Sequence, residues 1–183
     1  EKLFGVFLSK NDPQVQCTAL RGLTGIFIAH PKEMLRMDQS GMIEAVMRKS
    51  APQELQQTAL RCWRDILLSE ESRIESGDAK AKMDAKKDIT VSKKISGDQD
   101  ADSTLFGGIL TNHTSRLFSM TCSRDVGIRQ SAVELVGHLL RQGQVNPNET
   151  VPVLLALQGD LESTIRLHAL KLLMQEGERR PDM

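Results

Sequence analysis

Hydrophobic positions in this chain recur with the spacing of amphipathic helices, and four stretches repeat one pattern. Each stretch has alanine four residues after its start and large apolar residues five and eight residues after it. These offsets place the apolar side chains on one face of a helix, and the small alanine lets two helix backbones approach closely. The starts are Val15, Leu55, Ile128 and Ile165, and the alanines are Ala19, Ala59, Ala132 and Ala169.

A second amphipathic helix is predicted before each repeated one. Residues 34–49, 104–120 and 149–158 have this pattern, and the opening residues look like the end of another such helix. Successive starts lie about 40 residues apart except in the middle, where the interval is longer, and this period is typical of HEAT and armadillo units. The pattern predicts an all-α fold: a HEAT-type solenoid of about four helical hairpins with one insertion, in which neighbouring hairpins cover each other's apolar faces.

Turn and cap residues delimit the repeated helices, which would line the concave side of such a solenoid and are called inner helices below. Asp12, Pro52, Asp125 and Asp160 stand in the turns where inner helices are expected to begin. Helix ends are predicted at His30-Pro31, Gly143 and Gly177.

The predicted organisation has repeats 1 and 2 in residues 1–69, a charged insertion in 70–103, repeats 3 and 4 in 104–177, and a tail in 178–183. The insertion is poor in apolar residues and interleaves acidic with basic ones. Its first part is compatible with an extension of the preceding helix, and the rest favours a mobile, solvated loop over a nuclear-import or DNA-binding patch. Because the apolar pattern is already under way at the first residues, we expect a fragment of a longer solenoid.

Composition gives no sign of catalysis or of a cofactor. The 24 basic and 24 acidic residues cancel, so nucleic acid or membrane binding would need local patches. Cys17, Cys62 and Cys122 lack metal-site spacing and favour buried free thiols in a reducing compartment. The four histidines stand apart from other ligands, and no apolar run is long enough for a membrane span. We therefore expect a binding protein that is not an enzyme, with no metal and no cofactor.

Two turns resemble the turn of HEAT repeats, in which an Asp and an Arg from successive repeats pair in a ladder. Asp160 precedes Ile165-Arg166, and Asp125 precedes Ile128-Arg129 with a tighter spacing. We favour structural pairing over ligand contact for Arg129 and Arg166.

One exposed position is repeatedly basic. Six residues after the starts stand Arg21, Arg61, Glu134 and Lys171, and Arg64 lies near Arg61. This position points away from the packed face, so stacked inner helices would align these side chains in a stripe. A basic stripe would bind DNA phosphates or a partner. An ordinary solvated face is the alternative, and Glu134 interrupts the stripe.

Residues 124–166 carry a more specific order of motifs. A helix starting with Ile-Arg ends in a Gln-Gly turn, followed by a proline-containing turn, a short helix led by Val-Pro, and an Asp-containing turn (Ile128-Arg129, Gln142-Gly143, Asn146-Pro147, Val151-Pro152, Gly159-Asp160). This order resembles the Nipped-B/adherin family, the large HEAT-repeat subunit of the cohesin loader. Ala29-His30-Pro31 and Glu70-Glu71-Ser72-Arg73 also look like that family. The chain departs from its usual residues at Asn146, Thr150 and Leu161, as a divergent member would.

The resemblance implies a nuclear scaffold that loads cohesin on chromatin. Such a protein would hold DNA together with the SMC heads and kleisin of cohesin, and would stimulate cohesin's own ATPase without supplying a catalytic group. A small helical-repeat loader partner would bind through a region outside this chain. The alternative is a generic HEAT adaptor of the transport or phosphatase-scaffold type, which binds proteins alone; DNA binding distinguishes the two.

Overall fold

The computed structural model describes residues 6, 7, 10, 12–31, 33, 46–48, 50–75 and 110–180. Within these ranges it contains six α-helices, one short 3-10 helix and no strand. The expected all-α helical-repeat class is therefore confirmed. The elements are α2 (Pro13–Ala29), α5 (Gln53–Glu75), α9 (Thr114–Thr121), α10 (Val126–Arg141), α11 (Pro147–Ala156), η1 (Leu157–Gly159) and α12 (Ser163–Arg179).

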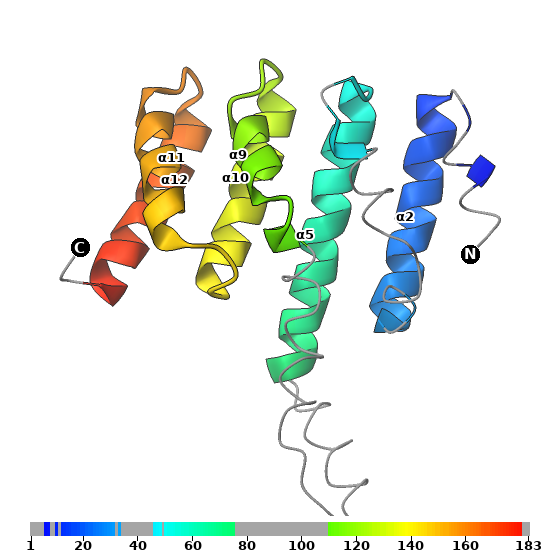
Figure 1. Cartoon of the computed structure of the whole chain (residues 1–183), viewed down its shortest axis with the longest axis horizontal. Coiled ribbons are helices and arrows are strands. Elements are labelled where there is room, and N and C mark those ends of the chain that lie inside the picture. Colours follow the sequence, from blue (N-terminus) through cyan, green and yellow to red (C-terminus); the bar gives the residue numbers. More distant parts are fainter. Residues whose placement is uncertain are drawn as a thin grey trace, which may run out of the picture.

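The inner helices α2, α5, α10 and α12 stand side by side in one row (Figure 1). Each packs against the next one, α2 on α5, α5 on α10 and α10 on α12. In the same view α9 lies in front of α10 and α11 in front of α12, and both outer helices pack against the inner helix behind them. The second half of the described chain is thus a two-layered stack of hairpins.

The repeated alanines lie where inner helices meet. Ala19 is 5% exposed, and the other three are completely buried. The large apolar residues five and eight positions after each start are also buried in the first three repeats. The repeated offsets therefore mark the packed face of these helices. The fourth repeat differs because Leu170 is 43% exposed. No described element packs on that side of α12, which is the last helix of the row.

The expected cap residues begin two inner helices. The Asp12 carboxylate accepts hydrogen bonds from the backbone N–H of Gln14 and Val15, and Asp125 accepts one from Ile128 at 2.8 Å. These bonds satisfy N–H groups that have no partner inside the helix. α12 instead starts after Glu162, two residues beyond the predicted turn residue Asp160.

Gly143 ends α10 in a left-handed conformation with φ of 71°. The N–H of Gln144 donates to the carbonyl of Leu139 at 2.8 Å, and the N–H of Gly143 donates to Leu140 at 3.1 Å. Those two bonds form a Schellman motif, which requires the backbone angle that glycine adopts most easily. The same role predicted for Gly177 was wrong, because α12 continues through it to Arg179.

α5 extends to Glu75 and so takes in the first residues of the insertion range, where the sequence was compatible with an extension of this helix. Two other boundaries differ from the sequence-based predictions. The helix predicted for 104–120 is interrupted by a turn at Asn112 and His113 before α9. α11 starts earlier than expected, at Pro147, with the Asn146 side chain as its cap. The first predicted helix, most of 34–49 and residues 76–109 lie outside the described residues.

Candidate functional site

The basic stripe predicted on the inner helices is exposed at three of its positions. Arg21 lies on α2, Arg61 on α5 and Lys171 on α12, and all three residues are solvent-exposed. None of the three forms an ion pair within the described part of the chain. Three cations, on α2, α5 and α12, are therefore available to an anionic ligand, and Glu134 holds the same position on α10.

Arg64 and Glu134 occupy the middle of this face and neutralise each other. Nη1 of Arg64 lies 2.8 Å from a Glu134 oxygen, and its Nη2 lies 3.0 Å from Asp65. Burial alone would lower the pKa of Arg64, but hydrogen bonds with the two carboxylates outweigh burial and raise it. The pair joins α5 to α10 across the stripe. The guanidinium of Arg64 is thus already paired with two carboxylates and is less available to a ligand than the guanidinium of Arg21 or Arg61.

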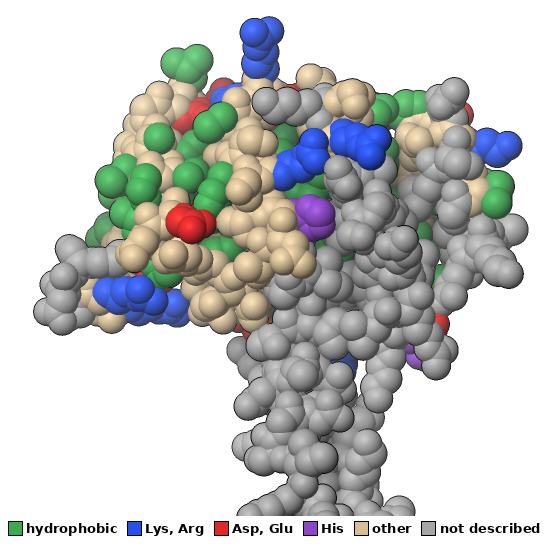
Figure 2. Space-filling view, in the orientation of Figure 1, with side chains coloured by type: hydrophobic (Ala, Val, Ile, Leu, Met, Phe, Trp, Pro, Cys, Tyr) green, Lys and Arg blue, Asp and Glu red, His purple; other side chains and the backbone are tan. Residues whose placement is uncertain are grey.

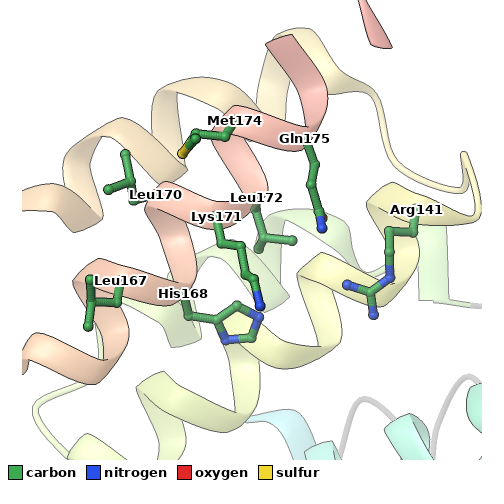
Figure 3. Close-up of a pocket in the computed structure, with 8 residues that line it drawn as sticks. All are labelled: Arg141, Leu167, His168, Leu170, Lys171, Leu172, Met174 and Gln175. Carbon is green, nitrogen blue, oxygen red and sulfur yellow. The ribbon is translucent and has the colours of Figure 1, made fainter. Parts of the chain in front are cut away.

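Beyond this pair, cationic and imidazole groups gather where α10 meets α12. A guanidinium nitrogen of Arg141 lies 2.8 Å from Nδ1 of His138. Burial, followed by the nearby Arg141 charge, lowers the pKa of His138. Burial likewise lowers the pKa of His168, and the Glu134 charge opposes this shift. Arg141, His168 and Lys171 line one side of an open hollow of about 560 Å³ (Figure 3).

The opposite side of the molecule has a different surface. Figure 2, seen from the side of α9 and α11, shows hydrophobic side chains over the C-terminal helices and basic ones at several places on the described residues, two of them side by side near the middle. Leu155 on α11 is 57% exposed, and Leu161 in the following turn is 92% exposed. Exposed apolar side chains are therefore a feature of this side of the described residues, beside the basic ones that it also carries.

Arg129 and Asp160 connect the turns of two successive repeats. Nε of Arg129 donates to one Asp160 oxygen at 2.8 Å, and Nη2 donates to the other at 3.0 Å. Nη1 donates to the backbone carbonyls of Ser123 and Arg124. The two side chains are only 13% and 7% exposed. This two-pronged, largely buried pair has the geometry of a structural contact rather than that of a free ligand site.

Arg166 repeats half of the Arg129 arrangement. Its Nη1 donates to the carbonyls of Asp160 and Leu161, which lie six and five residues before it, as Ser123 and Arg124 do before Arg129. This comparison makes Ser123 the counterpart of Asp160. The N–H of Asp125 donates to the Ser123 hydroxyl just as the N–H of Glu162 donates to Asp160. Asp125, which was aligned with Asp160 from the sequence, instead occupies the helix-cap position.

Sequence reasoning missed the role of two glutamines in the preceding repeat. Gln56 stands at the position of Arg129, and its amide donates to the carbonyls of Ala51 and Arg48 at 2.8 and 3.0 Å. Gln56 therefore donates hydrogen bonds to the carbonyls of the turn before its own helix, as Arg129 does in the next repeat, but it carries no charge. A side chain at Gly127 would collide with the amide of Gln57, so glycine provides the space for that amide. The sequence did contain a signal for Gln56, because Gln56 and Arg129 both stand one residue after the start of their repeat.

The expectations about thiols hold for two of three cysteines. Cys17 and Cys62 are buried and free, whereas Cys122 is free but exposed. Burial raises the pKa of the Cys62 thiol, so this group stays protonated near neutral pH.

Among the described residues, no group of three His, Cys, Asp or Glu side chains could hold a metal ion. No described helix is both long and apolar enough to cross a membrane.

Comparison with known proteins identifies the relatives of this chain. Residues 106–183 match the family model described as "Sister chromatid cohesion C-terminus". The mouse Nipped-B-like protein is 25% identical over 95% of this chain, and Nipped-B-like protein A of zebrafish is 25% identical over 92% of it. The chain is a homologue of Nipped-B-like proteins. It spans 6% and 7% of the length of these two relatives, and the resemblance seen in the sequence is confirmed.

The segment that matches the Nipped-B family model contains only part of the candidate surface. It includes the Arg129–Asp160 pair and the hollow beside Lys171, whereas Arg21, Arg61 and Arg64 precede it. A crystal structure of an engineered protein also aligns with 92% of this chain and 75% of its own, at 14% identity and a TM-score of 0.35. That likeness is too low to add to the fold argument.

Proposed function

We propose that this chain is a scaffold segment of a cohesin-loading factor, which binds cohesin and DNA in the nucleus and promotes the loading of cohesin onto chromatin. The match of residues 106–183 to a family of sister chromatid cohesion supports this role. In this proposal the chain holds the SMC heads and kleisin in place and stimulates their ATPase. It contributes a surface and no catalytic group. The small helical-repeat partner of the loader binds outside this segment.

DNA binding, within this proposal, uses the exposed cations of the inner helices. Arg21, Arg61 and Lys171 would contact phosphates, which carry no sequence information. Arg64 contributes less, because Glu134 and Asp65 already occupy its guanidinium. Each neutralised phosphate adds about −0.9 to the slope of log affinity against log salt, so three contacts give a slope of about −2.7 on duplex DNA.

The test measures the affinity of the chain for a labelled DNA duplex at several salt concentrations by fluorescence anisotropy. Arg61→Glu should weaken binding equally on unrelated sequences and make the salt slope shallower. Arg124→Glu is the matched control, because it makes the same charge change at an exposed residue in a turn. The DNA proposal fails if both variants bind as the unmodified chain does, or if both weaken binding by the same factor.

A second measurement separates cohesin loading from the generic adaptor. Purified cohesin heads with kleisin are mixed with the chain, and both association and ATP hydrolysis are followed with and without DNA. The loader proposal expects binding of these subunits and faster hydrolysis. An adaptor without DNA binding would show neither DNA affinity nor a DNA-dependent change. Absence of cohesin binding together with absence of DNA binding would reject the proposed function for this segment.

A further inference from the structure

Four hydrogen-bond donors from two helices converge on the hollow between α10 and α12. Figure 3 shows Arg141 reaching from the end of α10 toward His168, Lys171 and Gln175 on α12. The donors are a guanidinium, an imidazole, an ammonium and an amide. Together they can surround an oxyanion from several directions, which a single surface lysine cannot do.

Acidic partners are missing from this hollow. None of its eight lining residues is Asp or Glu. Lys171 and His168 form no hydrogen bond or ion pair in the described part of the chain, although His168 is half-buried. The neighbouring carboxylate of Glu134 is held by Arg64 at 2.8 Å. Lys171 and His168 therefore have spare binding capacity, and Arg141, of which one nitrogen contacts Nδ1 of His138, keeps its other N–H groups for a ligand.

An exposed apolar ledge lies beside the cationic side. Leu167, Leu170 and Met174 follow one another along α12 and are 66%, 43% and 60% exposed. All three also line the hollow. A DNA backbone presents phosphates and sugars, and it has no large apolar group to cover such a ledge. A peptide can place a phosphorylated side chain on the cations and a leucine-like side chain on the ledge at the same time.

We propose that this hollow binds a phosphorylated peptide. The phosphate of a phosphoserine or phosphothreonine lies among Arg141, His168 and Lys171, and an apolar side chain a few residues away covers Leu167, Leu170 and Met174. The charge of the phosphate, about −1.5 to −2 at neutral pH, complements the two permanent cations, and its oxygens accept from the converging donors. This site shares Lys171 with the proposed DNA contacts, whereas Arg141 and His168 belong to the hollow alone and Arg21 and Arg61 lie outside it.

The experiment uses the full chain and short fluorescent peptides as probes. One peptide has a central phosphoserine with leucine three residues later in an alanine-glycine background, and its partners carry serine or glutamate in place of phosphoserine. Calorimetry or anisotropy should show at least tenfold tighter binding of the phosphorylated peptide. Arg141→Gln should reduce that affinity at least tenfold, whereas Arg124→Gln should leave it unchanged.

Further variants separate the phosphate contact from the ledge. Lys171→Arg keeps the charge and should retain most of the affinity, whereas Lys171→Met should lose it. Leu170→Ser should weaken the leucine peptide but not a phosphopeptide with glycine in place of leucine. Circular dichroism of each variant checks that loss of binding is not loss of folding. If a variant does not fold, competition by inorganic phosphate for the phosphopeptide on the unmodified chain takes its place.

Three results would overturn the inference. Equal affinity for the phosphorylated and unphosphorylated peptides would show that the hollow does not bind the phosphate. Loss of duplex DNA binding by Arg141→Gln, with no phosphopeptide binding, would make the hollow an extension of the DNA surface. Self-association of the chain that Leu170→Ser abolishes, with no phosphopeptide binding, would show that the ledge is a helix-packing face, as the position of Leu170 in the repeat implies, and that a second copy covers it. None of these results bears on cohesin binding, so the proposed function is judged separately.

Discussion

Removing the guanidinium of Arg129 would break the contact that joins the last two turns. Four hydrogen bonds would disappear, two to Asp160 and two to the carbonyls of Ser123 and Arg124. Because the Asp160 side chain is only 7% exposed, water replaces these donors poorly. Breaking a buried pair from one side costs about 3–5 kcal/mol, and we expect Arg129→Ala to lose about 3 kcal/mol because its site keeps some contact with solvent.

The assay is urea unfolding followed by circular dichroism and by the fluorescence of Trp63, which is 6% exposed in the native chain. A double-mutant cycle with Asp160→Ala isolates the pair itself, for which we expect a coupling free energy of about 2 kcal/mol. Asp160→Asn is the conservative control, since it keeps an acceptor for the Glu162 N–H. A loss below about 0.5 kcal/mol for Arg129→Ala, or a coupling near zero, would refute the reasoning.

The Arg129–Asp160 pair should also make the stability of the chain depend on pH in the acid range. Burial raises the pKa of Asp160, but hydrogen bonds from Arg129 and from the Glu162 backbone outweigh burial and hold the pKa below its ordinary value. A lowered folded-state pKa contributes stability above the unfolded value of about 3.9, and that contribution is lost as pH falls through the folded value. The difference in stability between the unmodified chain and Asp160→Asn should therefore be constant near pH 7 and shrink below about pH 4.

Three further changes test the packing, the helix end and the surface charge. Ala132→Leu should overpack the completely buried contact on α10 and cost about 1–3 kcal/mol in urea unfolding; an unchanged midpoint would show that the register is wrong. Gly143→Ala should cost about 1 kcal/mol because of its φ of 71°, whereas Gly159→Ala, without such an angle, should be close to neutral in the same assay. Glu134→Gln should free Nη1 of Arg64, while Asp65 still holds the other nitrogens, and should steepen the salt slope of DNA binding by at most about 0.9; a slope equal to that of the unmodified chain would argue that Arg64 faces no DNA.

The inner helices could be predicted because one small residue and its apolar neighbours recur at fixed offsets. Burial of Ala59 and Ala132 follows directly from that register. The helix ends were harder, because a glycine ends a helix only where the chain turns away. Gly143 adopts the required left-handed angle, whereas Gly177 does not and stays inside α12. Local sequence does not distinguish these two glycines.

The candidate surface could be predicted only in part. Repeat register placed Arg21, Arg61 and Lys171 at exposed positions, because one offset on each inner helix faces solvent. It could not show that Arg64 meets Glu134, since these residues lie 70 positions apart and belong to helices separated by an insertion. The hollow was missed for the same reason. Arg141 is the last residue of α10 and His168 lies inside α12, with α11 between these two helices in the chain, so their proximity depends on how α10 and α12 pack.

Since each inner helix packs against the next one in the row, the joints between inner helices act in series. An applied bend is then shared unequally, and the softest joint takes the largest part. Charged pairs connect both of the later joints, Arg64 with Glu134 between α5 and α10 and Arg129 with Asp160 between α10 and α12. Because Arg61 lies on α5 and Lys171 on α12, a bend at either joint would change the distance between these two side chains.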